Sequence, residues 1–268
     1  MNKKKYKYVF IVLAFRTGRD IPGFIKTLSS KFDDYKVVVV NSYYNEESLA
    51  EIRDIAFEND CDFIPIENKG YGYGNNQGIK YALENYNFDY LIVCNADIEV
   101  QKWDVGELPS EKVSAPMITT INGKKQNPYW AKSNKFGDWL IYKGHKNQSR
   151  LFMFLGQGMN KLIREIYLLS FAKSRKRVSR IYAAHGSFLI FPRKIVDRIA
   201  PVFDENMFLY YEEAYLAKKL HRNNIEIELQ KDISILHYED GSTKGSNIDL
   251  SKHASQSYIY YYEKYCKK

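Results

Sequence analysis

The sequence predicts an α/β fold in which a mostly parallel central sheet carries helices on both faces. Strand-like and helix-like segments alternate over the first hundred residues with short links, which is the chain order of parallel β-α-β units. The run 36–40 is apolar without alternation, as in a strand buried on both faces. With 268 residues, 45% of them hydrophobic, the chain is long enough to bury a sizeable core.

The apolar pattern predicts the elements of the first hundred residues in turn. Residues 8–15 are a short apolar run behind a basic start. We interpret them as a buried first strand, because the run is too short to span a bilayer and no signal-peptide cleavage site follows it. Helical spacing of apolar residues predicts a helix at 46–59, and short apolar runs predict strands at 61–66 and 90–94. The other elements expected in this part are short helices at 21–30 and 78–84.

The region from 122 to 180, here called the insert, differs in character from the first hundred residues. It contains a helix-like segment at 159–171 and closes with the basic run from Lys173 to Arg180. Strand character returns at 187–191. The remaining expectations are a helical turn at 194–199 and a tyrosine-rich helix or strand at 258–265.

The composition leaves the kind of partner open. The formal net charge of +8 and the pI near 9.1 indicate an anionic partner. A nucleic acid, an anionic membrane surface and a phosphorylated substrate all fit this charge. A solvated basic face is the alternative. The three cysteines Cys61, Cys94 and Cys266 are scattered and odd in number, so we expect a reducing, cytoplasmic location.

The tripeptide Asn95-Ala96-Asp97 follows an apolar strand directly. Ligands of such sheets bind beyond the carboxyl ends of the strands, so Asp97 is expected to face the ligand crevice. Mg²⁺ or Mn²⁺ is often held by one or two carboxylates together with substrate phosphates. The alternative is that Asp97 caps the segment that follows it.

The segment 67–78 carries four glycines in nine positions, between a predicted strand and a predicted helix. Its amides are therefore candidates to face an anionic group at a helix N-terminus. It matches neither the Walker loop nor the GxGxxG fingerprint. A flexible surface loop is the alternative.

Two further candidates lie downstream. Glu212 and Glu213 end an aromatic run, where a carboxylate in a partly apolar pocket is suited to general-base chemistry. The alternative is an exposed helix start, where glutamate is favoured. His237 follows the apolar run 233–236; it either completes a metal site at a strand end or is structural.

In this order the motifs resemble the family 2 glycosyltransferases of the GT-A fold, of the bacterial rhamnosyl-, galactosyl- and glucosyltransferase kind. The resemblance covers roughly residues 6 to 245 and leaves out the insert and the tail. It implies one Rossmann-like GT-A domain over 1–268, with a nucleotide-sugar-binding half at 1–105, an acceptor half at 106–240 and a C-terminal segment at 241–268. The segments that carry it are Ala14-Phe15, Val37–Asn41, Asn68–Ile79, Asn95–Asp97, Gly186–Ile190, Phe203–Glu213, and His237 with Ser242.

The resemblance implies a role for each matching position. Asp97 matches the metal-binding aspartate of the D-x-D motif, and His237 matches a histidine near the metal and diphosphate. Glu213 matches the expected catalytic base, with Glu212 as its neighbour. The implied donor-binding residues are Ala14, Phe15, Asn41, Asn68, Gly70, Gly74, Asn76 and Asn95. The chain departs from the family pattern in having Tyr215 for a second aspartate, Glu for Asp at the base, and Asn41 for a base-reading aspartate.

The implied activity is inverting transfer of a sugar from a UDP- or dTDP-sugar to a glycan or lipid-linked hydroxyl, with Mn²⁺ or Mg²⁺ as cofactor. It implies cell-surface polysaccharide synthesis, such as capsule or O-antigen, in the cytoplasm or peripherally on the inner face of the cell membrane. We expect no nucleic-acid partner, because the tyrosines are spread along the chain. The alternatives are a non-catalytic glycan-binding relative and a sugar-phosphate nucleotidyltransferase, although no G-x-G-T-R type segment follows the first strand.

The insert also carries a hypothesis of its own. Apolar residues between Leu151 and Phe171 recur largely at helical spacing, and the cationic run from Lys173 to Arg180 follows at once. This pattern is typical of a segment that lies in a membrane interface. Packing of the apolar stripe against the sheet, with solvated cations, is the alternative, since core-facing helices have the same spacing.

Overall fold

In the computed structural model, residues 3–239 and 249–267 are described, and Ser242 lies outside them. The strands of the described part form one sheet in the order β3-β2-β1-β4-β8-β6-β9-β5, with β7 also paired to β9. The strands are β1 Lys4–Ala14, β2 Tyr35–Ser42, β3 Asp62–Ile66, β4 Tyr86–Cys94, β5 Ile98–Trp103, β6 Val113–Thr120, β7 Val178–Ile181, β8 Phe188–Pro192 and β9 Ile227–His237.

The sheet is mostly parallel, as the sequence predicts. Strands β3, β2, β1 and β4 are parallel to one another. Strand β8 is antiparallel to both β4 and β6, and β6 is parallel to β9. Strands β5 and β7 are antiparallel to β9. The carboxyl ends of β1, β2, β4 and β9 therefore meet at one edge of the sheet, and β8 begins at that same edge.

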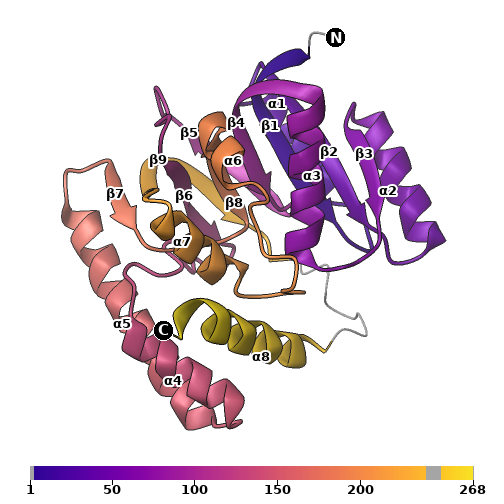
Figure 1. Ribbon diagram of the computed structural model, residues 1–268. Helices are drawn as coiled ribbons and strands as arrows, with labels where there is room; N and C mark the ends of the chain where they lie inside the picture. The colour runs from indigo at the N-terminus through magenta and orange to yellow at the C-terminus, as the bar shows by residue number, and fades with distance from the viewer. Residues whose placement is uncertain (1–2, 240–248, 268) are drawn as a thin grey trace.

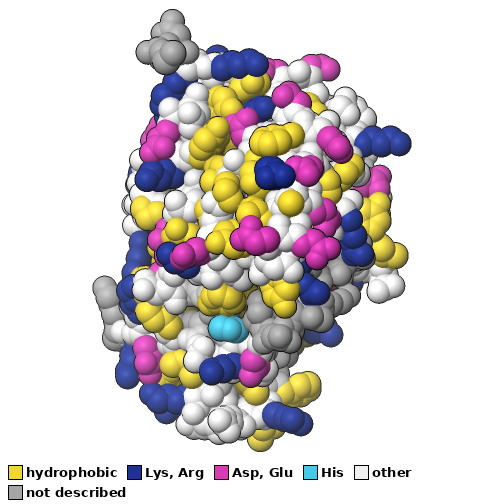
Figure 2. Space-filling model, turned by 90° about the vertical axis from the view of Figure 1, so that its right-hand side faces the viewer, with side chains coloured by type: hydrophobic (Ala, Val, Ile, Leu, Met, Phe, Trp, Pro, Cys, Tyr) yellow, Lys and Arg dark blue, Asp and Glu magenta, His cyan; other side chains and the backbone are white. Residues whose placement is uncertain are grey.

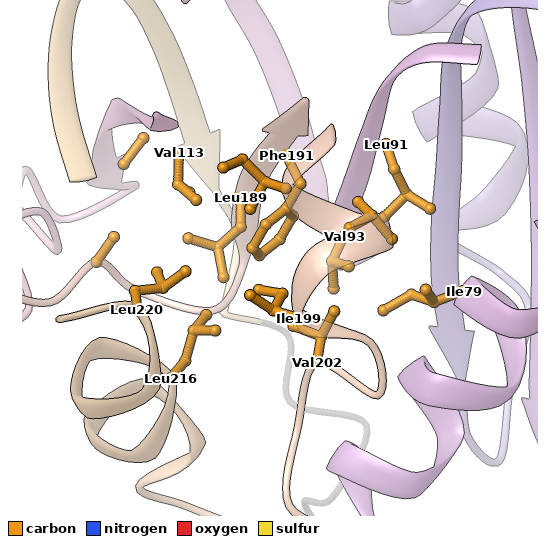
Figure 3. Packing of buried hydrophobic residues seen from close by; sticks show 14 of the residues in the cluster. Ile79, Leu91, Val93, Val113, Leu189, Phe191, Ile199, Val202, Leu216 and Leu220 are labelled. Carbon is orange, nitrogen blue, oxygen red and sulfur yellow. The ribbon is translucent and has the colours of Figure 1, made fainter. Parts of the chain in front are cut away.

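Helices cover both faces of the sheet (Figure 1). The side chains of β1 alternate between the faces, because Val9 and Ile11 join one buried cluster while Phe10 and Val12 join the other. Figure 3 shows the first cluster, where Ile79 and Leu216 approach the sheet from two helices. The helices on that face are α3 Tyr71–Asn85, α6 Arg193–Ile199 and α7 Glu212–Arg222, and those on the other are α1 Ile21–Ser29 and α2 Glu46–Glu58.

The insert forms two helices that pack against each other, α4 Lys135–Lys146 and α5 Arg150–Lys173. Helix α5 is longer than the predicted 159–171 and begins nine residues earlier. The tail is helical, with α8 Leu250–Tyr261 followed by a π-helical turn, Tyr262–Cys266. Tyr258 and Tyr261 of α8 are buried against α4 and α7. No helix of residues 3–239 and 249–267 is long and apolar enough to cross a membrane.

The glycine-rich segment is largely helical, so the alternative interpretation as a flexible surface loop is wrong. The predicted helix start at residue 78 is wrong as well. Helix α3 begins at Tyr71, so most of the segment forms its first two turns. Close packing explains the glycines: a Cβ on Gly74 would lie 2.5 Å from Cδ1 of Leu13, and one on Gly78 2.5 Å from Cγ2 of Ile11. Among the four glycines of this segment, Gly70, the N-cap residue, is the one with a positive φ, of 105°.

Candidate active site

A cavity of about 520 Å³ lies at the edge of the sheet where the parallel strands end. Its wall includes Ala14 at the end of β1, Ser42 at the end of β2 and His237 at the end of β9. Asn95, Ala96 and Asp97 follow β4 and line it as well. Ligands of open α/β sheets bind at this edge, so the cavity is the candidate active site.

The carboxylate of Asp97 and the imidazole of His237 form one side of the cavity. Nε2 of His237 lies 3.3 Å from Oδ1 of Asp97 and 3.3 Å from Nδ2 of Asn95. On the other side of the ring, Nδ1 lies 2.7 Å from Oε1 of Gln126, whose Nε2 donates to Glu239 at 2.7 Å. This amide orientation requires Nδ1 to be a donor, which leaves Nε2 as the ring nitrogen that faces Asp97 and Asn95.

The electrostatics of Asp97 favour its ionised form. Burial alone would raise the pKa of this carboxyl, but hydrogen bonds from His237 and Asn95 and the coulombic effect of His237 outweigh burial and lower it. Asp97 is thus a carboxylate at neutral pH.

The pair fits a divalent cation. Two adjacent ligands of an octahedral ion, each bound at about 2.1 Å, are roughly 3 Å apart, close to the 3.3 Å between these atoms. No group of three or more His, Cys, Asp or Glu side chains in the described part of the chain has the arrangement of a metal site. Asp97 and His237 would therefore hold a cation together with ligands from the substrate, as Mg²⁺ sites with few protein ligands do.

A second acidic feature faces the same cavity, at the start of α7. Tyr210 and Tyr211 both have positive φ, 73° and 68°, and turn the chain so that Glu212 and Glu213 line the cavity. Oε1 of Glu213 accepts a hydrogen bond from the backbone N–H of Gly186 at 3.3 Å. Glu212 is 4% exposed, and its Oε1 has no partner in the described residues.

The two carboxyl groups differ in how readily they ionise. Burial and then the neighbouring Glu213 raise the pKa of Glu212 well above its ordinary range. Burial also raises the pKa of Glu213, but backbone N–H groups, including that of Gly186, act in the opposite direction. Both carboxyl groups accept backbone hydrogen bonds, but Glu213 is the less buried of the two and the pKa of Glu212 is raised further, so Glu213 ionises first and Glu212 stays protonated beside it.

His185 is a cavity residue that sequence reasoning did not identify. Its ring centroid lies 5.8 Å from that of His237, and Nδ1 accepts from the backbone N–H of Ser187 at 3.2 Å. Burial first, and then the charge of His237, lower its pKa to about 3, so it is neutral. The sequence rule considers residues that follow strands, whereas His185 precedes an antiparallel strand that begins at the same edge.

The implied donor-binding residues are only partly brought together. Ala14, Phe15, Asn68, Gly70 and Asn95 line the cavity.

Three of the implied donor-binding residues do not line the cavity. Asn41 is fully buried beside Ser42, and neither end of its side-chain amide has a partner in the described residues. Asn76 is bonded to the chain itself: it donates to the carbonyl of Phe203 at 2.9 Å and to Glu205 at 3.0 Å. Gly74 packs against Leu13.

The fold and this cavity define the class of protein, a glycosyltransferase of the GT-A fold. The solved structure of GalNAc-T7 with UDP, GalNAc and Mn²⁺ matches 96% of this chain with a TM-score of 0.63 at 12% identity, over 48% of its own length. Staphylococcus aureus TarS 1–349 in complex with UDP-GlcNAc matches 90% of this chain with a TM-score of 0.52 at 11% identity, over 62% of its own length.

The chain belongs to glycosyl transferase family 2, whose family model matches residues 9–199. A curated relative is the low-salt glycan biosynthesis hexosyltransferase Agl10 of Haloferax volcanii, 24% identical over 234 residues. The match covers 85% of this chain and 66% of that relative. The resemblance and the fold expected from the sequence are thereby confirmed.

Proposed function

We propose that this protein is a metal-dependent inverting glycosyltransferase that uses a nucleotide-diphosphate sugar. One observation carries the proposal: the Asp97–His237 pair and the Glu212–Glu213 pair line the same cavity. Transfer from such a donor needs positive charge beside the departing diphosphate and a base beside the acceptor hydroxyl. The cavity holds groups suited to both tasks.

In this proposal each pair has its own task. Asp97 and His237 would hold Mn²⁺ or Mg²⁺, which would supply positive charge beside the diphosphate. Ionised Glu213 accepts the proton of the acceptor hydroxyl as the oxygen forms its bond to the anomeric carbon. The bond from that carbon to the diphosphate oxygen breaks on the opposite face, so the configuration inverts. Protonated Glu212 adds no second negative charge beside the base.

The substrate classes follow from the site and the relatives. A UDP- or dTDP-sugar is the proposed donor, and the match to structures solved with UDP and UDP-GlcNAc supports testing UDP-hexoses first. The resemblance implies that Asn41 bonds the nucleotide base, but its amide is fully buried and outside the lining of the cavity, so we assign it no contact with the donor. We propose a glycan or lipid-linked acceptor in cell-surface polysaccharide synthesis, in line with the glycan-biosynthesis role in the name of the Haloferax relative.

A donor panel tests the function. Purified protein is incubated with UDP- and dTDP-hexoses and Mn²⁺ or Mg²⁺, and released nucleoside diphosphate is measured with and without EDTA. We expect metal-dependent release from one donor and its loss in Asp97→Ala, with an unchanged circular dichroism spectrum. Turnover by Asp97→Ala at the wild-type rate would show that the metal assignment is wrong. Binding of a donor or glycan with no turnover of any donor would favour the non-catalytic alternative.

A further inference from the structure

Helix α5 presents a row of large apolar side chains to solvent. These residues recur at helical spacing over most of the 24-residue helix. Exposure is high along the row, with Phe154 72% and Leu169 64% exposed. The row, here called the α5 stripe, consists of Leu151, Phe154, Leu155, Leu162, Ile166 and Leu169.

The stripe is not the face with which α5 packs on the protein. Gly156 and Asn160 are buried at the contact with α4, where a Cβ on Gly156 would lie 2.7 Å from the carbonyl oxygen of Gly137. At 100° per residue these two positions lie roughly opposite Leu151, Leu162 and Leu169 on the helix. Packing of the stripe against the sheet, one of the two sequence interpretations, is therefore wrong for these residues.

The charge of the molecule is concentrated on the segment that carries the stripe. Residues 150–180 contain eight Lys and Arg and a single carboxylate, Glu165, in a chain whose formal net charge is +8. Asp232 pairs with Arg177 and Glu226 with Arg180. Lys161, Lys173, Arg175 and Lys176 are exposed, and no carboxylate of the described residues pairs with them.

The opposite side of the molecule differs. Helix α5 lies on the outer flank of the fold, away from the β3–α2 edge (Figure 1). Figure 2 shows the side that bears that edge, where cations and carboxylates are interspersed and hydrophobic groups lie among them. The α5 flank thus combines a long exposed apolar row with four exposed cations that no carboxylate of the described residues pairs with.

We propose that α5 docks the protein on an anionic lipid bilayer, lying in the plane of the interface with the stripe in the acyl region. An exposed helix with an apolar face and flanking Lys and Arg is the structure that binds in this way. Its length of about 36 Å suits lying along the surface, and the cations face the anionic headgroups. The inference needs no catalysis, so it stands or fails separately from the proposed function.

Vesicle sedimentation tests the proposal on the whole chain. The probes are vesicles of phosphatidylcholine alone and of phosphatidylcholine with phosphatidylglycerol, without donor or acceptor. We expect binding to the anionic vesicles that weakens as salt is raised, because screening acts on exposed charges. Absence of binding to anionic vesicles at low salt would overturn the proposal.

A stripe variant and a control variant distinguish docking through α5 from nonspecific binding to vesicles. Leu162→Ser with Leu169→Ser removes two stripe side chains and is expected to weaken binding by at least roughly tenfold. Phe57→Ser, at a side chain 63% exposed on α2, is the matched control and should bind as the wild type does. Equal loss in the control, or no loss in the stripe variant, would contradict the assignment to α5.

The charge contribution has its own pair. Changing Lys173, Arg175 and Lys176 together to Gln is expected to weaken binding roughly 100-fold, at about fivefold per cation. Arg177 is left in place because its ion pair with Asp232 of β9 holds the residue that precedes β7. The control changes Lys5, Arg53 and Lys80, which are exposed cations outside the insert, to Gln.

Sedimentation equilibrium tests whether the stripe instead binds a second copy of the chain. If the wild type forms a dimer that does not bind vesicles, and the stripe variant dissociates that dimer, the stripe is a dimer interface and the proposal is overturned.

Discussion

At the scale of single residues, Glu212 and Glu213 are adjacent in the sequence but occupy different environments. The carboxylate of Glu213 is bonded to the backbone of Gly186, while Glu212 is almost fully buried with one oxygen unpaired. The order of ionisation that follows makes Glu213 the proposed base. The family resemblance distinguishes Glu213 from Glu212, but the local sequence does not show the different environments of the two carboxyl groups.

The first prediction tests that difference. Glu213→Gln keeps the shape and removes the ionisable group, so kcat should fall roughly 10²–10⁴-fold with little change in the KM of the donor. The matched variant Glu212→Gln replaces a group that is already neutral, so its kcat should fall far less. Steady-state release of nucleoside diphosphate measures both. A large loss in Glu212→Gln with little in Glu213→Gln would transfer the role to Glu212.

At the scale of elements, the start of α4 holds a buried carboxyl group. Asp138 is 5% exposed, and its Oδ1 has no partner in the described residues. Burial, which outweighs the opposing effect of Lys218, raises its pKa to about 7 from an ordinary value of 3.8. Between these two values the folded protein holds a proton that the unfolded chain has released, so the free energy of unfolding decreases as the pH rises.

Asp138→Asn should therefore stabilise the protein at neutral to basic pH. The gain in the free energy of unfolding should be at most roughly 3–4 kcal/mol at about pH 8 and close to zero at about pH 4. Urea denaturation of both proteins at the two pH values measures it. A gain of equal size at both pH values would show that packing, and not the ionisation of Asp138, is responsible.

The glycines of α3 allow a second prediction at the element scale. A Cβ at Gly78 would lie 2.5 Å from Cγ2 of Ile11 and 2.7 Å from Cγ2 of Val40, so Gly78→Ala should destabilise the fold by roughly 1–3 kcal/mol. The control is Gly23→Ala in α1, where a Cβ meets nothing within 4 Å. That change should stabilise by roughly 0.5–1 kcal/mol, because alanine favours the helix. Equal effects of the two substitutions would contradict the close-packing explanation.

At the scale of the whole molecule, the cavity is lined by residues from Leu13 to Glu239, so a ligand bound there should stabilise the fold as a whole. UDP with Mn²⁺ should raise the thermal midpoint of the wild type, by several degrees when the ligand reaches about 100 times its Kd. Asp97→Asn retains the shape but loses the charge that holds the cation, so its midpoint should rise much less with UDP and Mn²⁺. Differential scanning fluorimetry measures both without any turnover. The same rise in both proteins would show that Asp97 does not bind the cation.

The extent of sequence prediction varied with the kind of feature. The strands at 36–40, 61–66 and 90–94 and the helices at 21–30 and 46–59 are confirmed within a few residues, because their signals are local apolar periods. Asp97 and His237 line one cavity, because motifs at strand ends meet wherever parallel strands share an edge. Glu212 and Glu213 line the same cavity from the start of α7, and only the family resemblance indicated that position. The roles of these residues and the division into halves stay predictions.

The sequence by itself determined the α/β class and part of the cavity lining, such as Asp97 and His237, since apolar periodicity and strand-end position depend on neighbouring residues. Only the tertiary structure decided three other features: that the glycine-rich segment is helical, that His185 joins the cavity, and that the α5 stripe faces solvent. A glycine can be needed for backbone freedom or for close packing, and a strand can be parallel or antiparallel to its neighbours. An apolar face with helical spacing can pack in a protein core or lie in a membrane interface. In each case the outcome depends on contacts between residues that are tens of positions apart in the sequence. Those contacts exist only in the folded chain.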